Sequence, residues 1–203
     1  MMAKNQITKD IIKKLIKIPG KTRGVGFHTD TEYVREKKGE KGLIAVKEEL
    51  INLGCPIDYE NIKITGWYPV GLRAVSVLAI KKVFNWSDKE IEDMGNTAPK
   101  YSFIVRLLMK YFLTFSMTHK QGSNYWVKHY TVGKLEPSNY DLEKKYYTVR
   151  VKDFKIHPIL CIYLGGYIVR IGQFLLIGKN FKVKETKCMF KGDPYHEYVV
   201  RWE

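Results

Sequence analysis

The chain has 203 residues, a length that suits one domain with a sizeable core and leaves little room for two. Its 45% hydrophobic and 13% aromatic content is typical of a folded protein and excludes a long disordered segment. The formal net charge of +14 favours anionic partners, such as nucleic acid, a membrane surface or an acidic protein, and does not choose among them.

The N-terminal part begins with a predicted amphipathic helix. Ile7, Ile11 and Leu15 repeat at helical spacing before Pro19-Gly20 ends the pattern. Lysines fill most of the other positions, which predicts either a solvated basic face or a contact with nucleic acid or membrane. The first ten residues lack the apolar run of a signal peptide, so we expect a cytoplasmic protein.

The next segments are expected to be one extended arm followed by helices. Residues 24–39 alternate small, aromatic and charged side chains, which suits a strand or arm. Helical spacing then predicts helices over 42–54 and from about 70 to 84. A capping box, Ser87 to Glu90, opens a short helix that Gly95 should end.

A longer helix is predicted from Pro99 to Met117, with an aromatic stripe that could be core or the wall of a ligand pocket.

The C-terminal part has the pattern of an antiparallel sheet. Period-two alternation predicts strands at 124–133 and 144–154, with a turn around Pro137, and two more strands at 181–190 and 196–202. The apolar run 158–178 is long enough to span a membrane, but Arg170 and Gln173 within it favour a buried helix.

The fold class is therefore α+β, with helices packed on an antiparallel β-sheet. We expect a single domain over 1–203, with a mainly helical part at 1–118 and an α+β part at 119–203.

Four side chains near the C-terminus are candidate ligands of a metal ion. Cys188 and His196 lie symmetrically about Gly192, so a hairpin centred there would place them opposite one another. Cys161 lies in the first turn of a helix, where the dipole favours a thiolate. Glu185 can be the fourth ligand if a bulge near Thr186 turns it inward.

This set suits a closed tetrahedral Zn²⁺ site that ties the hairpin to the helix N-terminus. The alternative is two buried free cysteines, a hairpin histidine and a surface glutamate.

Residues 157–202 resemble the C-terminal part of the 4-vinyl reductase, or hydrocarbon-binding, domain family, which is similar in fold to subunits of the transport protein particle of vesicle tethering. The matching features are a Cys before a GY-containing helix, then E-x-x-C, then G-D and a ligand eight residues after the second Cys. The resemblance implies a structural zinc on Cys161, Glu185, Cys188 and His196, where His196 replaces the family's final Cys.

The resemblance also implies an apolar pocket between helices and sheet for an aromatic, lipid-like or tetrapyrrole-related ligand. Trp126, His129 and Tyr167 are our candidate pocket residues, because aromatic walls with one orienting polar group are the usual composition. The alternative for all three is ordinary core packing or, for His129, a solvated ring.

The function that follows is a non-catalytic sensor or regulatory domain that binds a hydrophobic small molecule or lipid, acts as a homodimer and signals through a protein partner. An adaptor or tethering protein is the alternative. The chain has no dinucleotide loop, phosphate loop, H-E-x-x-H or G-x-S-x-G motif, so nothing favours an enzyme. Nucleic-acid or membrane binding depends on the basic charge alone.

Overall fold

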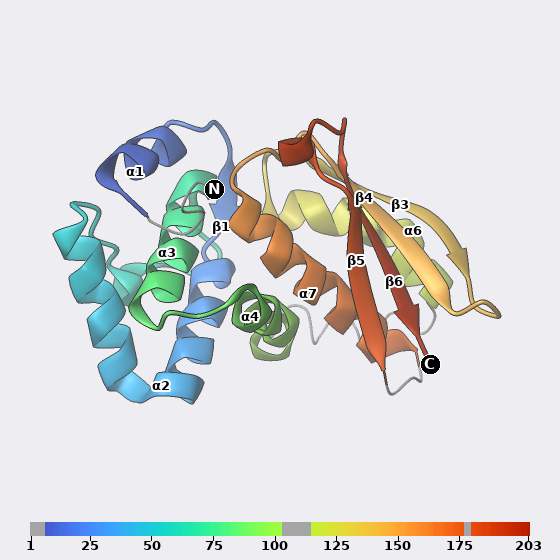
Figure 1. The fold of residues 1–203 in the computed structure, drawn as a ribbon, viewed down its shortest axis with the longest axis horizontal. Helices are drawn as coiled ribbons and strands as arrows, with labels where there is room; N and C mark the ends of the chain where they lie inside the picture. The colour runs from blue at the N-terminus through green and yellow to red at the C-terminus, as the bar shows by residue number, and fades with distance from the viewer. Residues whose placement is uncertain (1–6, 103–114, 177–179) are drawn as a thin grey trace.

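A computed structural model describes residues 7–102, 115–176 and 180–203 (Figure 1). The described α-helices are α1 (Lys9–Ile16), α2 (Val25–Asn52), α3 (Val70–Val83), α4 (Asp88–Tyr101), α6 (Phe115–His129) and α7 (Pro158–Leu175). The strands are β1 (Lys21–Arg23), β2 (Trp67–Pro69), β3 (Lys134–Asp141), β4 (Tyr146–Lys152), β5 (Phe181–Lys187) and β6 (His196–Trp202), with short 3₁₀ turns at Tyr59–Asn61 and Met189–Lys191.

The strands form two antiparallel sheets. β1 pairs with β2, and the other four form a sheet in the order β3-β4-β6-β5. In Figure 1 the N-terminal helices gather at one side of the molecule and the larger sheet stands at the other, with α7 between them. The expected α+β class with helices on an antiparallel sheet is confirmed.

Helix α7 packs against α4 on one side and against β5 and β6 on the other, whereas α6 packs against β3. Gly95 and Gly166 make the contact with α4 possible, because a Cβ on either would overlap a backbone carbonyl of the opposite helix. Buried side chains from Ile12 in α1 to Trp202 in β6 belong to one core cluster. A single domain over 1–203 remains our proposal, and the expected division at residue 118 falls inside α6.

Two predicted extended segments are wrong, because both are helical. Residues 24–39 form the first half of α2, which kinks at Gly39, where φ is +68°. Phe27, Asp30 and Val34 are buried on one face of that helix. Because Asp30 is polar, the apolar residues of this face do not repeat at helical spacing in the sequence.

The predicted strand 124–133 is also wrong, because its first residues belong to α6. Trp126 and Tyr130 are buried at helical spacing while Val127 between them is 63% exposed. The β-branched and aromatic content had favoured a strand. The turn expected at Pro137 is instead β3, an edge strand in which Pro is tolerated and the register shifts between Pro137 and Tyr140.

Several other predictions are confirmed. The capping box at Ser87 and Glu90 opens α4, although the helix continues past Gly95 to Tyr101. Strands β4, β5 and β6 lie where alternation predicted them, and the register between β5 and β6 shifts between Glu185 and Lys187, as the expected bulge near Thr186 requires. Most of the helix predicted from Pro99 to Met117 lies outside the described residues.

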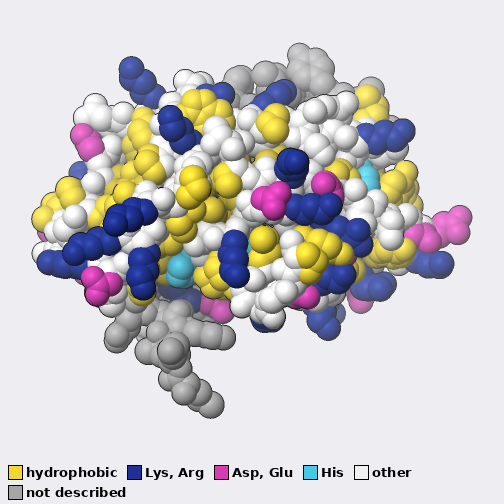
Figure 2. Space-filling view, turned by 90° about the horizontal axis from the view of Figure 1, so that it is seen from above, with side chains coloured by type: hydrophobic (Ala, Val, Ile, Leu, Met, Phe, Trp, Pro, Cys, Tyr) yellow, Lys and Arg dark blue, Asp and Glu magenta, His cyan; other side chains and the backbone are white. Residues whose placement is uncertain are grey.

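Helix α7 is long and apolar enough to cross a membrane by length and composition alone, and 56% of it is buried within the protein, as expected for a core helix. Figure 2 shows Lys and Arg side chains dispersed over one face of the molecule, between hydrophobic and a few acidic ones. On that face the positive charge is not gathered into a single groove.

Candidate functional site

A cavity of about 160 Å³ lies between α6, α7, the inner face of β3 and β4, and the N-terminal halves of α2 and α3. Its walls are mostly apolar and aromatic, which is the usual composition of a small-molecule site. The three predicted pocket residues Trp126, His129 and Tyr167 all line this cavity. The structure thus brings together side chains from α6 and α7 that lie about forty residues apart.

Trp126 is held in place by its surroundings. Its indole nitrogen donates a hydrogen bond to the carbonyl of Val132 at 2.9 Å, and its ring stacks on Tyr130 with centroids 4.5 Å apart. Phe154 meets both rings edge-on. A fixed ring whose N–H is already paired can serve as a rigid apolar wall of the pocket.

His129 is an uncharged group at neutral pH. Burial and, to a smaller extent, the positive charges of Arg73, Arg23 and Lys128 together lower its pKa to about 4. A neutral imidazole in the wall can donate or accept one hydrogen bond without adding charge to the cavity.

A buried ion pair lies beside the cavity, with Arg73 in the wall. Arg73 is 5% exposed and Asp30 is 0% exposed, with guanidinium–carboxylate distances of 3.3 and 3.4 Å. Tyr163 donates to Asp30 at 2.8 Å, and Arg73 donates to the hydroxyl of Tyr130 at 2.7 Å. The Arg73 guanidinium also lies 4.5 Å from the centre of the Tyr163 ring.

Neither Arg73 nor Asp30 was predicted as a site residue. The signal in the sequence was Arg73 itself, a charged residue within the apolar run of α3. Val70, Ala74 and Val77, on the same helix, are also buried. A charge buried at such a position requires a partner, and the sequence could not say that Asp30 supplies it.

His119 is a further pocket histidine that sequence reasoning did not assign. Its ring packs against Phe115 and Tyr140, with centroids 5.6 and 5.0 Å away. Its Nε2 atom is buried and has no hydrogen-bond partner within the described part of the chain. Burial lowers the pKa of this imidazole, so the ring is neutral.

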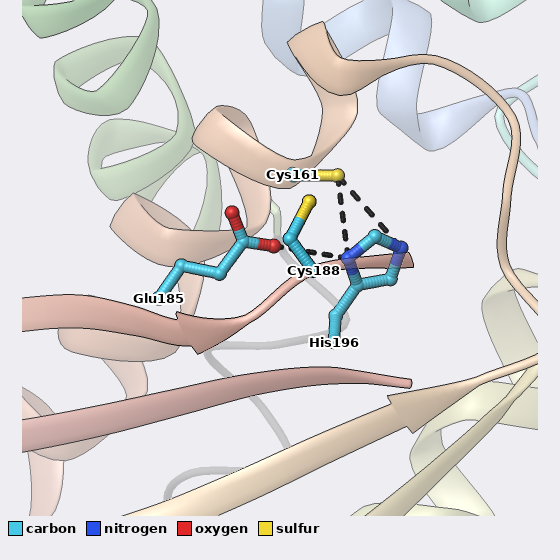
Figure 3. Close-up of side chains that lie close together, drawn as sticks. All are labelled: Cys161, Glu185, Cys188 and His196. Carbon is cyan, nitrogen blue, oxygen red and sulfur yellow. Dashed lines mark hydrogen bonds and ion pairs between the residues drawn. The ribbon is translucent and has the colours of Figure 1, made fainter. Parts of the chain in front are cut away.

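The second site is the predicted metal-ligand set, and the structure brings all four of its side chains together. One ligand atom from each of Cys161, Glu185, Cys188 and His196 lies within 4.8 Å of every other. Figure 3 shows Cys161 arriving from the first turn of α7, Glu185 and Cys188 from the end of β5, and His196 from the start of β6. The bulge in β5 is what places Glu185 and Cys188 on the same side.

The histidine is the centre of this cluster. His196 Nδ1 lies 2.9 Å from a Glu185 oxygen and 3.6 Å from the Cys161 sulfur, and its Nε2 lies 3.3 Å from the carbonyl of Phe154. Burial raises the pKa of both the Cys161 and the Cys188 thiol, and Glu185 raises both further. In the absence of a cation, the two sulfurs are therefore neutral thiols.

Comparison of the sequence with models of known protein families and with curated proteins finds no match. Solved structures do match. An H-NOX protein from S. oneidensis in the Fe(II)NO ligation state has a TM-score of 0.66 and 14% identity, and the match covers 89% of this chain and 99% of that one. The chain has the fold of H-NOX domains.

Other matches agree with this. An unliganded Fe(II) H-NOX protein mutant from K. algicida has a TM-score of 0.62 at 10% identity, covering 89% of this chain and 96% of that one. An oxygen-binding H-NOX domain related to soluble guanylate cyclases, solved as its oxygen complex, has a TM-score of 0.61 at 11% identity, with 89% and 95% covered.

These matches correct two expectations. The resemblance to the 4-vinyl reductase domain and to transport-particle subunits is wrong, because the matching solved structures are H-NOX domains. The expectation of Zn²⁺ as the cofactor is withdrawn with it, because those proteins are described with Fe(II) and with haem and none with zinc. The zinc tie between hairpin and helix is likewise not confirmed, although the four side chains do meet.

Haem is the group that the matching fold implies, and the cavity formed by the described residues is too small for it. His119 Nε2 is a buried nitrogen without a partner in the described residues, and it is the atom that would bind the iron if haem were present. The cavity volume of about 160 Å³, however, is close to the ~150 Å³ cavity that holds one benzene. The porphyrin ring of haem has four pyrrole rings and is several times larger. Haem therefore has no role in the function proposed below.

Proposed function

We propose that this chain is a non-catalytic sensor or regulatory domain that binds a compact hydrophobic small molecule in the cavity between α6, α7 and the sheet. The observation that carries this proposal is the cavity itself, whose wall combines fixed rings such as Trp126 with a few convergent polar groups. The described solved structures with this fold are named by their bound gas or ligation state, which supports a ligand-binding role.

The cavity volume of about 160 Å³ favours a ligand of about one aromatic ring. A short acyl chain is the lipid-like alternative. His129 and Tyr167 are the groups that we propose to orient the ligand, because both line the cavity and both are uncharged at neutral pH.

We also propose that Cys161, Glu185, Cys188 and His196 hold one metal ion, whose identity we leave to elemental analysis. Two thiols, a carboxylate and an imidazole with mutually close ligand atoms support this proposal. Four protein ligands would leave no open position for water, so the ion would stabilise the fold rather than catalyse a reaction.

Helix α7 connects the two proposed sites. Cys161 lies in its first turn, and Leu164, Tyr167 and Ile171 farther along the same helix line the cavity. A ligand in the cavity would therefore touch the element that the metal would anchor. The partner that reads any resulting change, a homodimeric state and a cytoplasmic location stay predictions from the sequence.

Native mass spectrometry of the purified protein distinguishes this function from that of an adaptor. A sensor with a filled cavity should carry a small organic adduct, and Ile171→Trp should lose it because the larger ring occupies the cavity. Ile162→Trp is the matched control, since Ile162 is a partly buried residue of α7 outside the cavity lining. Adduct-free spectra for all three proteins would favour an adaptor that acts through protein contacts.

A further inference from the structure

The charged side chains of the cavity wall all have the same sign. Arg23 and Arg73 line the cavity, and no Asp or Glu does among the residues that the structure describes. Asp30, the partner of Arg73, lies behind the guanidinium rather than in the wall. The two arginines and one aspartate leave an excess positive charge beside an otherwise apolar space.

Arg73 has N–H donors beyond those that its described contacts use, and it lines the cavity. Its guanidinium has five N–H donors, and the described contacts to Asp30 and Tyr130 use three of them. The Cβ of a side chain at Gly26 would lie 2.7 Å from this guanidinium, so only glycine allows α2 to approach it there. The group is thus fixed in position before any ligand arrives.

Arg23 is the second arginine in the wall of the cavity, and its side chain is held by the protein. Its Nε donates to the carbonyl of Lys128 at 3.0 Å, its Nη1 donates to the carbonyl of Thr65, and its guanidinium stacks 3.8 Å from the centre of the Trp67 ring. Carbonyl oxygens do not neutralise the charge, so Arg23 adds a positive charge, partly screened by solvent, beside the cavity.

His129 responds to this field. Burial is the largest cause of its lowered pKa, and the positive charges of Arg73 and Arg23 act in the same direction. Those two charges attract an anion, and this attraction must exceed the cost of burying the anion's charge.

We propose that the ligand is a compact aromatic anion, with its ring against Trp126 and its carboxylate or similar acidic group against Arg73, and with Arg23 as a second positive charge in the wall. This inference rests on the proposed ligand-binding function and adds the charge of the ligand. A planar guanidinium with N–H donors left over is well suited to a carboxylate. In a space of low polarity, such a charge-assisted contact discriminates strongly between an acid and its amide.

The experiment compares benzoate with benzamide, which has nearly the same shape and no charge, by isothermal titration at neutral pH. We expect benzoate to bind about tenfold or more tightly, since a charge-assisted pair replaces a neutral one. The double variant Asp30→Asn/Arg73→Gln removes both charges of the buried pair together and should reduce this preference to about twofold or less. Arg23→Gln, at a partly exposed position, is a second variant with less risk to folding and should lower benzoate affinity alone.

Arg150→Gln is the matched control, because Arg150 on β4 pairs with Glu197 and does not line the cavity. It should leave both affinities unchanged. If benzamide binds as tightly as benzoate, the inference is wrong and the proposed function stands. If neither compound binds at millimolar concentration but toluene does, the inference is wrong and the proposed function stands; if none of the three binds, the proposed function itself is wrong. A preference for benzoate that survives in both arginine variants would overturn the assignment to Arg73 and Arg23.

Discussion

The sulfur atoms of Cys161 and Cys188 are buried beside the carboxylate of Glu185 and the ring of His196. Sequence symmetry about Gly192 located Cys188 and His196, and Glu185 was placed three residues before Cys188. The predicted helix start located Cys161, because strand pairing and helix starts can be predicted from local patterns. The identity of an ion depends on coordination geometry and on the chemistry of relatives, which the spacing did not contain.

Cys188→Ser tests the proposed metal site. Elemental analysis of the wild-type protein should find about one metal ion per chain. The variant should lose the ion, because a serine hydroxyl is a much weaker metal ligand than a cysteine thiolate. Loss of the ion should lower the free energy of unfolding by about 3 kcal/mol. This is the stabilisation expected from a bound ion whose free concentration is roughly 100 times its Kd. Cys55→Ser is the control, since Cys55 is a buried cysteine outside the cluster. Equal metal content in wild type and Cys188→Ser would contradict the site.

His129 should make the stability of the protein depend on pH. Its pKa is lowered to about 4 in the folded state from an ordinary 6.5, so between these values the unfolded chain binds more protons. Stability is therefore present above about pH 6.5 and falls as the pH drops toward 4. His129→Gln should flatten this part of the profile by up to about 3 kcal/mol at pH 4 in urea unfolding, at about 1.4 kcal/mol per pKa unit. A profile identical to that of the wild type would show that His129 is not held in its neutral form.

At the scale of elements, the contact between α4 and α7 depends on single glycines. Gly166→Ala should destabilise the protein by about 1–3 kcal/mol, because its Cβ would overlap the carbonyl of Glu92 and lie 2.8 Å from the backbone nitrogen of Asn96. Gly165→Ala is a neighbouring control on the same helix, where the added Cβ would meet Val183 at an ordinary 3.7 Å. It should be neutral or stabilising, since alanine has the higher helix propensity. Urea unfolding measures both, and equal effects would contradict the close approach of the helices.

Helices and strands were predictable where apolar residues repeat at helical or strand spacing. β4, β5, β6, α3 and α7 follow such patterns and lie near their expected positions. The first half of α2 was missed because Asp30 and Thr31 occupy its buried face, and a polar residue reads as exposed in a sequence. The partner that makes Asp30 acceptable there, Arg73, is 43 residues away, and no local pattern links the two.

At the scale of the whole molecule, the α+β class could be predicted but the fold could not. The order of strands β3-β4-β6-β5 and the position of α7 between α4 and the sheet are long-range properties. The resemblance considered from residues 157–202 covered a small part of the chain and led to the wrong family. The spatial match to H-NOX domains covers 89% of the chain at identities of 10–14%, a level at which sequence patterns carry little of the likeness.

The cavity volume predicts the outcome of a haem-loading experiment. Protein incubated with hemin and desalted should show no Soret band that depends on His119, because a porphyrin does not fit a space of about 160 Å³. His119→Ala, in which the buried Nε2 is absent, is the comparison protein. A Soret band that appears in the wild type and shifts or disappears in His119→Ala would show that the cavity opens far enough to hold haem.

The central claim is that the space between α6, α7 and the sheet is a binding pocket for a compact hydrophobic molecule. An NMR titration with toluene tests this claim most directly, because an apolar cavity of ~150 Å³ binds a single benzene ring. We predict saturable chemical-shift changes confined to α6, α7 and β4 in the wild type and in Ile162→Trp, and none in Ile171→Trp. Absence of saturable shifts in the wild type, or equal shifts in Ile171→Trp, would contradict the account.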